Sequence, residues 1–374
     1  MSGDADGSSS GETGASPGDG SATDGDDARA LIYGSYGYTG SLVAERAVQR
    51  GLAPVVAGRN ERRVRRQADD LGVEGRAFDL ADPGAVADRV RDVDVVVNCA
   101  GPFVDTYEPV VEACLRTGTH YLDITGEIEV FRAIAALDDR AREAGVTLMP
   151  GVGFDVVPTD CLAAHLYERL PSATRLFLAF EGFEGISPGT ARTAVEGFGA
   201  TVTLREDGRL VAVPIGERTR RIDFGDGPRL TTAIPWGDVV TAYHTTGIES
   251  VEVYAPVSWT QLRAMRASRP LAPFAKLPPV KATLRGLADA VASGPDEAAR
   301  RGGEVRIWGR VEDDEGSATA RMRTPEAYEF TVRSTLAVTE RVLGGDAPPG
   351  YRTPAGAYGP ELATSIEGVE LADC

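Results

Sequence analysis

A glycine-rich turn between an apolar run and a helical pattern constrains the fold of this chain most. The apolar run ALIY, residues 30–33, is followed by GSYGYTG, residues 34–40, and then by the helical pattern SLVAERAVQRG. The glycines stand at Gly34, Gly37 and Gly40. Such a turn lets the backbone approach a pyrophosphate, and the helix N-terminus beyond it supplies free N–H groups. The spacing GxxGxxG, a variant of GxGxxG, therefore predicts a dinucleotide site, with an ordinary tight turn as the alternative.

The residues after this turn continue to alternate between short apolar runs and helical patterns, as in a parallel α/β sheet. The apolar runs are 30–33, 54–57, 93–98, 121–124 and 146–149, with a weaker run at 76–78. The clearest helical pattern covers 127–145, where apolar residues from Val130 to Ala141 recur on one face. We therefore predict a Rossmann-type domain over residues 28–150.

The pattern changes after residue 150, where strand-like segments become more frequent. They are 175–183, 209–214, 229–234, 251–254, 305–311 and 318–323, and the last two flank a DDEG turn. Thr159 or Asp160 is expected to cap a helix ahead of them. So many antiparallel-looking segments predict a second, mixed α+β domain over residues 151–324.

The two ends of the chain differ from these domains. Thr324-Pro325 and Thr353-Pro354 are expected to open helices, so residues 325–374 are predicted to be a C-terminal helical segment that packs back on the first domain. Residues 1–27 are acidic, contain no base and are rich in Ser and Gly, which predicts a disordered tail. The fold class expected is α/β, with a Rossmann-type sheet, a mixed second domain and C-terminal helices.

The end of the second apolar run favours NADP over NAD. An NAD enzyme places an acid there to bind the ribose 2′-hydroxyl. This chain reads VVAGRNERRVRR, so Arg59 stands in that place and Arg63 follows one helical turn later. A guanidinium suits a 2′-phosphate, although a solvated basic helix face would give the same letters. Residues expected to line the cofactor are Gly34, Tyr36, Gly37, Tyr38, Thr39, Gly40, Arg59, Asn60, Arg63, Asp79, Asn98, Ala100, Gly101 and Pro102.

Composition limits the partners and the compartment. The net charge is −17, and Lys276 and Lys281 are the only lysines. Such a surface resembles that of halophilic proteins and does not suit nucleic acid, which needs a basic face. No run approaches the roughly 18 apolar residues of a membrane span, and no secretory leader is visible, so we expect a cytoplasmic protein. The cysteines and histidines show no metal-binding spacing, and no metal is expected.

Four segments carry a resemblance to a known family. They are VNCAGPFVDTYEPVVEACLRTGTHYLDITGE at 97–127, GVGFDVVPTD at 151–160, ISPGTARTA at 186–194 and RTPAGAYGPEL at 352–362. Together they resemble the saccharopine dehydrogenase-like oxidoreductases, in the branch that contains the trans-acting enoyl reductases. The resemblance implies an NADP-binding Rossmann domain, a second α/β domain and action on acyl or lipid-like substrates. It also implies substrate contacts from the Ser-x-Gly-Thr loop, through Ser187 and Thr190.

Polar residues at the ends of the fifth and sixth strands are the remaining candidates for chemistry. Thr125 and Glu127 are expected to contact substrate, and a proton donor is sought among Tyr107, His120 and Asp155. Water is the alternative donor, and each side chain also has a structural explanation. Other mechanisms are excluded: GISPG at 185–189 resembles a hydrolase elbow but has a proline where an amide is needed, and no Tyr-x-x-x-Lys pair is present.

We therefore expect an NADP-dependent reductase of an unsaturated acyl or lipid-like substrate, free or carrier-linked. The alternatives are an opine- or saccharopine-type amino-acid dehydrogenase, or a non-catalytic NADP-binding, lipid-associated protein. The bases between Arg263 and Arg285 lie in a stretch without acids, so residues 263–285 are a candidate for peripheral contact with an anionic membrane or a phosphate-bearing substrate. Pairing of these bases with acids elsewhere in the fold is the structural alternative.

Overall fold

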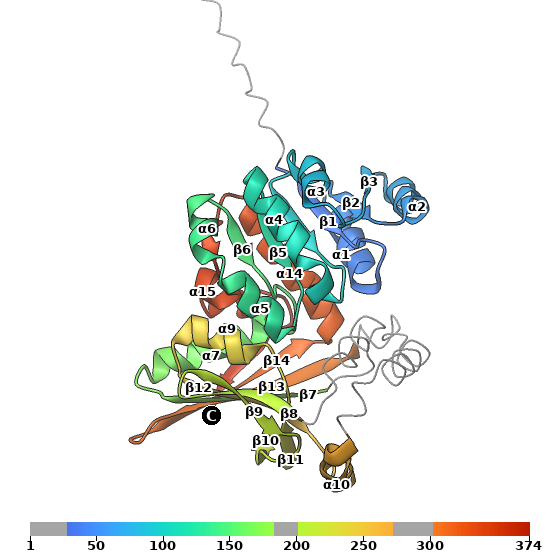
Figure 1. The fold of residues 1–374 in the computed structure, drawn as a ribbon. Helices are drawn as coiled ribbons and strands as arrows, with labels where there is room; N and C mark the ends of the chain where they lie inside the picture. The colour runs from blue at the N-terminus through green and yellow to red at the C-terminus, as the bar shows by residue number, and fades with distance from the viewer. Residues whose placement is uncertain (1–27, 183–200, 272–301) are drawn as a thin grey trace, which may run out of the picture.

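The computed structural model describes residues 28–182, 201–271 and 302–374, and within them the chain forms two sheets (Figure 1). The first sheet has the order β15-β6-β5-β4-β1-β2-β3, and each neighbouring pair is parallel. Its strands are β1 (Ala30–Tyr33), β2 (Val55–Gly58), β3 (Gly75–Ala77), β4 (Val95–Asn98), β5 (His120–Asp123), β6 (Thr147–Met149) and β15 (Gly350–Tyr351). The order 3-2-1-4-5-6 is that of a Rossmann domain. The Rossmann-type sheet was expected from the alternating pattern.

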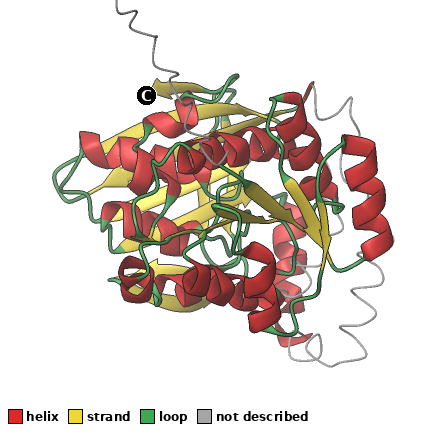
Figure 2. Cartoon of the chain, turned by 90° about the horizontal axis from the view of Figure 1, so that it is seen from above, coloured by secondary structure: helices red, strands yellow, loops and turns green. Residues whose placement is uncertain are grey.

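Helices cover both faces of this sheet, as the view from above also shows (Figure 2). They are α1 (Tyr38–Gln49), α2 (Glu61–Leu71), α3 (Pro83–Val90), η1 (Phe103–Asp105), α4 (Tyr107–Thr117), α5 (Ile128–Ala135) and α6 (Asp138–Glu143). The single helix expected over 127–145 is in fact two, because the chain leaves helical geometry at Leu137, which has φ −99° and ψ 8°.

The second sheet is mixed and lies below the first in Figure 1. Its order is β10-β11-β12-β7-β13-β14-β16, and the β8–β9 hairpin joins it through β12. The strands are β7 (Arg175–Glu181), β8 (Thr201–Glu206), β9 (Arg209–Pro214), β10 (Thr219–Asp223), β11 (Pro228–Ala233), β12 (Ser250–Pro256), β13 (Glu304–Glu312), β14 (Ser317–Pro325) and β16 (Glu370–Asp373). Four strands of the two sheets were not expected, because they are short or rich in charged residues and their apolar alternation is weak. They are β8, β10, β15 and β16.

The remaining helices connect the two sheets. They are α7 (Val157–Arg169), α9 (Asp238–Thr246), α10 (Trp259–Ser268), η2 (Arg269–Leu271), α14 (Ala327–Leu343), α15 (Pro354–Tyr358) and α16 (Glu361–Thr364). α7 and α9 pack on one face of the second sheet and lie between the sheets in Figure 1, while α14 packs on α1 and β4. A single apolar cluster therefore runs from β1 through α7 to β13 and α14.

Two helix caps differ from expectation. α7 begins at Val157, so Thr159 and Asp160 lie in its first turn and are fully buried. α14 is capped by Glu326, whose carboxylate accepts hydrogen bonds from the amides of Tyr328 and Glu329. Thr353 caps α15 as expected, since its hydroxyl accepts a bond of 3.0 Å from the amide of Gly356.

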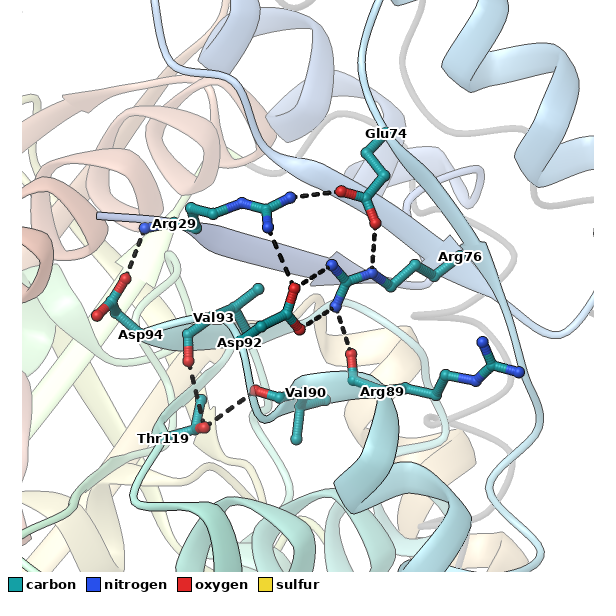
Figure 3. Close-up of polar contacts among 9 residues, drawn as sticks. All are labelled: Arg29, Glu74, Arg76, Arg89, Val90, Asp92, Val93, Asp94 and Thr119. Atoms are coloured by element: carbon teal, nitrogen blue, oxygen red, sulfur yellow. Dashed lines mark hydrogen bonds and ion pairs between the residues drawn. The ribbon is translucent and has the colours of Figure 1, made fainter. Parts of the chain in front are cut away.

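An ion-pair network braces the amino edge of the Rossmann sheet (Figure 3). Arg76 donates to both oxygens of Asp92 at 2.6 Å and to Glu74 at 2.7 Å. Arg29 pairs with the same two acids, so the chain segments before β1, β3 and β4 are held together. This edge lies opposite the glycine turn, so the network stabilises the domain without entering the candidate site.

No helix in the part of the chain that the structure describes is long and apolar enough to cross a membrane.

Candidate functional site

The glycine turn at the carboxyl end of β1 is held by its own backbone. Gly34 has φ +76°, and the amides of Gly34 and Ser35 both donate to the carbonyl of Ala57 on β2, at 2.8 and 3.1 Å. A Cβ on Gly40 would lie 2.3 Å from the Gly34 carbonyl oxygen, so only glycine lets α1 start this close to the turn. No side chain caps α1 and its first turn carries no acid, so its free amides suit a pyrophosphate.

The end of β2 carries the residues expected to select the dinucleotide. The Tyr36 hydroxyl accepts a 3.0 Å bond from the Asn60 amide, and its ring fills the space where a Cβ on Gly58 would be 2.6 Å from Cε1. Arg63 lies 4.5 Å above this ring and donates to the Tyr36 carbonyl at 3.0 Å. Arg59 is exposed and, among the described residues, has no hydrogen bond or ion pair. Its guanidinium is therefore available for a phosphate, beside an arginine whose position is already fixed.

Two predicted cofactor residues bind backbone atoms. Asn60 caps α2, because its side chain accepts a 3.0 Å bond from the Arg63 amide. Asp79 accepts a 3.0 Å bond from the amide of Ala81, two residues later. Their side chains shape the loops after β2 and β3, which bound the adenine end of a dinucleotide in this fold.

The end of β4 is fixed by a buried amide. Asn98 is fully buried; its Oδ1 accepts from the Ala100 amide at 3.0 Å and its Nδ2 donates to the Thr106 hydroxyl at 3.2 Å. Thr106 in turn donates to the Ala100 carbonyl at 2.6 Å. The Gly101–Pro102 peptide bond in this loop is cis. The Asn98 side chain thus positions the loop at 100–102.

A second buried polar group joins the ends of β5 and β6. Asp123 is fully buried and accepts from the Thr125 and Gly151 amides, each at 2.9 Å, and from the Tyr121 hydroxyl at 2.8 Å. Burial raises the pKa of Asp123 to about 6, against the effect of these donors. Tyr121 was not among the residues predicted for the site, because in the sequence it is an ordinary apolar residue of β5.

The two predicted substrate contacts after β5 are engaged with neighbouring backbone. Thr125 is fully buried, and its hydroxyl accepts from the Glu127 amide at 3.0 Å. The two carboxylate oxygens of Glu127 accept from the amides of Phe103 and Val104, each at 2.9 Å. Glu127 therefore anchors the turn η1 that follows β4.

The three candidate proton donors are placed very differently. His120 is the first residue of β5, and it pairs with Val95 at the amino edge of the sheet, opposite the glycine turn. Its Nδ1 accepts from the Thr147 amide at 3.0 Å, and burial lowers its pKa. This placement argues against His120 as a donor. Tyr107 opens α4 on the carboxyl side, partly buried, with its pKa raised mainly by burial.

The Asp155 side chain is partly accessible to solvent, and its pKa is raised. It follows β6 in the loop before α7, is partly buried, and its carboxyl group makes no hydrogen bond to the described residues. Its Oδ2 would lie 2.8 Å from a Cβ on Gly126, which places it at the end of β5. Burial, with the negative charge of Glu127, raises the pKa of Asp155 to about 7. A carboxyl with such a pKa can donate a proton near neutrality.

Aromatic side chains from the second domain and from α14 pack around the Asp155 loop. Trp236 donates from Nε1 to the Asp155 carbonyl at 2.9 Å and packs on Phe180 of β7, with ring centroids 4.5 Å apart. Phe154 lies 6.4 Å from Phe180 and 5.8 Å from Phe330 of α14. The sequence did not indicate Trp236, because it stands between two strands and far from any recognised motif.

Two further carboxyls are buried nearby. Asp160 accepts from the Thr245 hydroxyl at 2.5 Å and from the Ala355 amide at 2.9 Å, and burial raises its pKa to about 6. Asp238, the first residue of α9, has no hydrogen-bond partner for either carboxyl oxygen among the described residues. Burial, followed by the charges of Asp160 and Asp155, raises the pKa of Asp238 well above its usual value.

Some predicted residues lie outside the described parts of the chain. They are Ser187 and Thr190, the lysines at 276 and 281, and the acidic tail at 1–27. Of the basic segment, Arg266 and Arg269 donate to the carbonyls of Gly216 and Ile215, each at 2.8 Å.

Comparison with known proteins agrees with this geometry. Residues 30–149 match the family described as saccharopine dehydrogenase NADP binding domain. The chain is 28% identical to the saccharopine dehydrogenase-like oxidoreductase of Homo sapiens over 202 residues, which is 47% of either protein. It is 28% identical to the trans-acting enoyl reductase of Mycobacterium ulcerans over 216 residues, 53% of this chain and 52% of that protein. The chain thus matches about half the length of these relatives.

A solved structure shows the same fold over a longer stretch. Apo saccharopine dehydrogenase (L-Glu forming) from Saccharomyces cerevisiae superposes with a TM-score of 0.63, covering 93% of this chain and all of that one at 14% identity. The expected fold class and the resemblance to saccharopine dehydrogenase-like oxidoreductases are confirmed. NADP as the cofactor of the first domain is supported by the matched family as well as by Arg59.

Proposed function

Starting from a saccharopine dehydrogenase-type NADP-binding domain at residues 30–149, we propose that this protein is an NADPH-dependent reductase of an unsaturated acyl or lipid-like substrate. The observation that carries the proposal is Asp155, a carboxyl with a pKa of about 7 at the carboxyl edge of β5 and β6. In this strand order that edge faces the nicotinamide half of a dinucleotide, while the edge of β2 and β3 faces the adenosine half. The glycine turn lies between them.

The bound NADPH would supply the hydride, and the protein residues would supply position and a proton. The free amides in the first turn of α1 would hold the pyrophosphate, and Arg59 and Arg63 the 2′-phosphate. Asp155 would donate its proton to the α-carbon of the acyl group as the β-carbon is reduced. The resulting carboxylate would regain a proton from water, which reaches this partly exposed side chain.

The charges around Asp155 favour an enoyl group over an amino acid. Glu127 and Asp155 are both acidic, and the Asp155 backbone carbonyl accepts from Trp236, which packs on Phe180. An amino-acid substrate would bring carboxylates against these acids, whereas an enoyl chain brings apolar carbon. An opine- or saccharopine-type dehydrogenase is therefore the second candidate, and a non-catalytic NADP-binding protein the third.

We also propose the division into a Rossmann domain at 28–150, a substrate domain at 151–324 and a C-terminal segment at 325–374. The last segment would tie the two domains together, since α14 packs on α1 while β16 pairs with β14. Such an arrangement leaves the Asp155 loop between the two sheets, with Phe154 bonded through its amide to Thr331 of α14 at 3.0 Å.

The test is NADPH oxidation with an enoyl thioester, compared with a keto acid plus an amino acid. Asp155→Asn should lower kcat about 100- to 10,000-fold while the Kd for NADPH stays unchanged, because only the proton donor is lost. Tyr107→Phe is the matched control and should keep most of the turnover. If Asp155→Asn reduces substrate as fast as the unmodified protein, Asp155 is not the donor. Turnover of the keto acid alone would favour the second candidate, and binding of NADPH without any turnover the third.

A further inference from the structure

Glu127 stands out because its charge is fixed in place close to the proposed donor. Its two oxygens accept from the amides of Phe103 and Val104, an arrangement with two donors that suits an ionised carboxylate. The peptide that precedes it, at Gly126, touches Asp155: a Cβ there would lie 2.8 Å from Asp155 Oδ2 and 3.2 Å from its Cβ. Glu127 was predicted as a substrate contact, but its carboxylate instead binds the backbone amides of η1.

The other charged groups near Asp155 do not compete with this charge. Asp238, at the start of α9, faces Asp155, and Asp160, on α7, faces Asp238. Asp238 is fully buried, and despite the nearby Thr159 hydroxyl, burial raises its pKa well above the usual value, which favours the neutral form of its carboxyl. Glu127, ahead of α5, is thus the ionised neighbour that acts on Asp155.

We propose, on the basis of the function above, that Glu127 is a positioning residue for proton transfer: its fixed negative charge adds to the effect of burial and so helps to keep the Asp155 carboxyl in the protonated form that can donate. A like charge disfavours ionisation of a neighbouring carboxyl, and partial burial strengthens the effect because solvent screens it less. The same carboxylate holds η1 through Phe103 and Val104, so the loop after β4 and the acidity of Asp155 depend on one residue.

A direct titration of Asp155 tests this inference without requiring turnover. The protonated carboxyl is followed by infrared difference spectroscopy of the full-length protein across pH, and subtraction of the Asp155→Asn series isolates its band. Glu127→Gln should lower the midpoint by about one pH unit, because the charge is lost while one amide acceptor remains. The matched control is Glu129→Gln, which removes an exposed charge two residues later and should leave the midpoint unchanged.

Glu127→Asp separates charge from structure. The shorter side chain loses its hold on the amides of Phe103 and Val104 but keeps the charge, so its midpoint should stay near that of the unmodified protein. A midpoint that falls equally in Glu127→Asp and Glu127→Gln, or in neither, would overturn the inference. If the Gln variant does not fold, Glu127→Ala takes its place as the variant without the charge, and the same comparison with Glu127→Asp decides.

The pH dependence of kcat then links this titration to the proposed reaction. Turnover should fall above the Asp155 midpoint, and Glu127→Gln should move that fall to lower pH by the same amount. If the titration midpoint moves and the rate profile does not, Asp155 is not the donor and the proposed function fails at that step. If neither moves, the failure lies with Glu127.

Discussion

Replacing Arg59 with Gln should weaken NADPH binding and leave NADH binding unchanged. Arg59 is exposed and, in the described part of the chain, bonds to no other residue, so the change removes no contact within the fold. Its expected loss is one charge-assisted contact with the 2′-phosphate, about 1.5–3 kcal/mol. That corresponds to an increase in Kd of about 10- to 100-fold. Binding should not vanish, because Arg63 remains held over the Tyr36 ring.

Calorimetric titration of both cofactors into both proteins measures this effect. Arg65→Gln is the matched control, since it removes the same charge from an exposed position on α2, the helix that begins two residues after Arg59. Its Kd for NADPH should change far less, and the melting temperature of both variants should match that of the unmodified protein. Equal loss of NADPH affinity in the two variants would show that only the overall basic field of α2 matters. Tighter binding of NADH than NADPH to the unmodified protein would refute the role of Arg59.

Two further predictions concern stability. Arg76→Met should lower the free energy of unfolding by about 1–3 kcal/mol, less at high salt, because the Arg76 side chain is 12% exposed and bonds both oxygens of Asp92. Chemical denaturation measures this loss, and Arg66→Met is the control. The Arg66 and Asp70 side chains are 85% and 68% exposed, so their 3.7 Å ion pair should contribute almost nothing to stability. Burial raises the pKa of Asp160 from 3.8 to about 6. Between these two pH values the native protein holds a proton that the unfolded chain has released. The free energy of unfolding should therefore fall by up to ~3 kcal/mol as the pH rises from 3.8 to about 6. Asp160→Asn should lose that part of the slope, and it should be less stable at every pH because its one side-chain oxygen cannot replace both acceptors of the Thr245 hydroxyl and the Ala355 amide. An unchanged slope would contradict the assignment.

The Rossmann-type parallel sheet and the position of the glycine turn could be predicted because local signals carry them. The run at 30–33 coincides with β1, and the glycine turn and Arg59 stand where a parallel sheet requires them. The position of His120 was also available from the sequence: a four-residue strand that ends at Asp123 must place His120 at the other edge.

The catalytic end could not be predicted in the same way, because it depends on contacts between distant segments. Glu127 binds amides 23 and 24 residues earlier, and Trp236 bonds to Asp155 across 81 residues. Burial is also a property of the whole fold, so no local pattern reveals that Asp155 has a pKa of about 7. The sequence predicts Asp155 and His120 equally well as candidates. Only the surroundings of each side chain in the fold distinguish Asp155 from His120.

Transfer of deuterium from cofactor to product tests the proposed reaction most directly. NADPH carrying deuterium at the transferable position of C4 is incubated with the full-length protein and an enoyl thioester, and the product is analysed by mass spectrometry. We expect one deuterium from the cofactor at the β-carbon and one solvent proton at the α-carbon, with loss of both in Asp155→Asn despite unchanged NADPH binding. A saturated product without deuterium, or no product from any enoyl thioester while NADPH is bound, would contradict hydride transfer to an unsaturated acyl group.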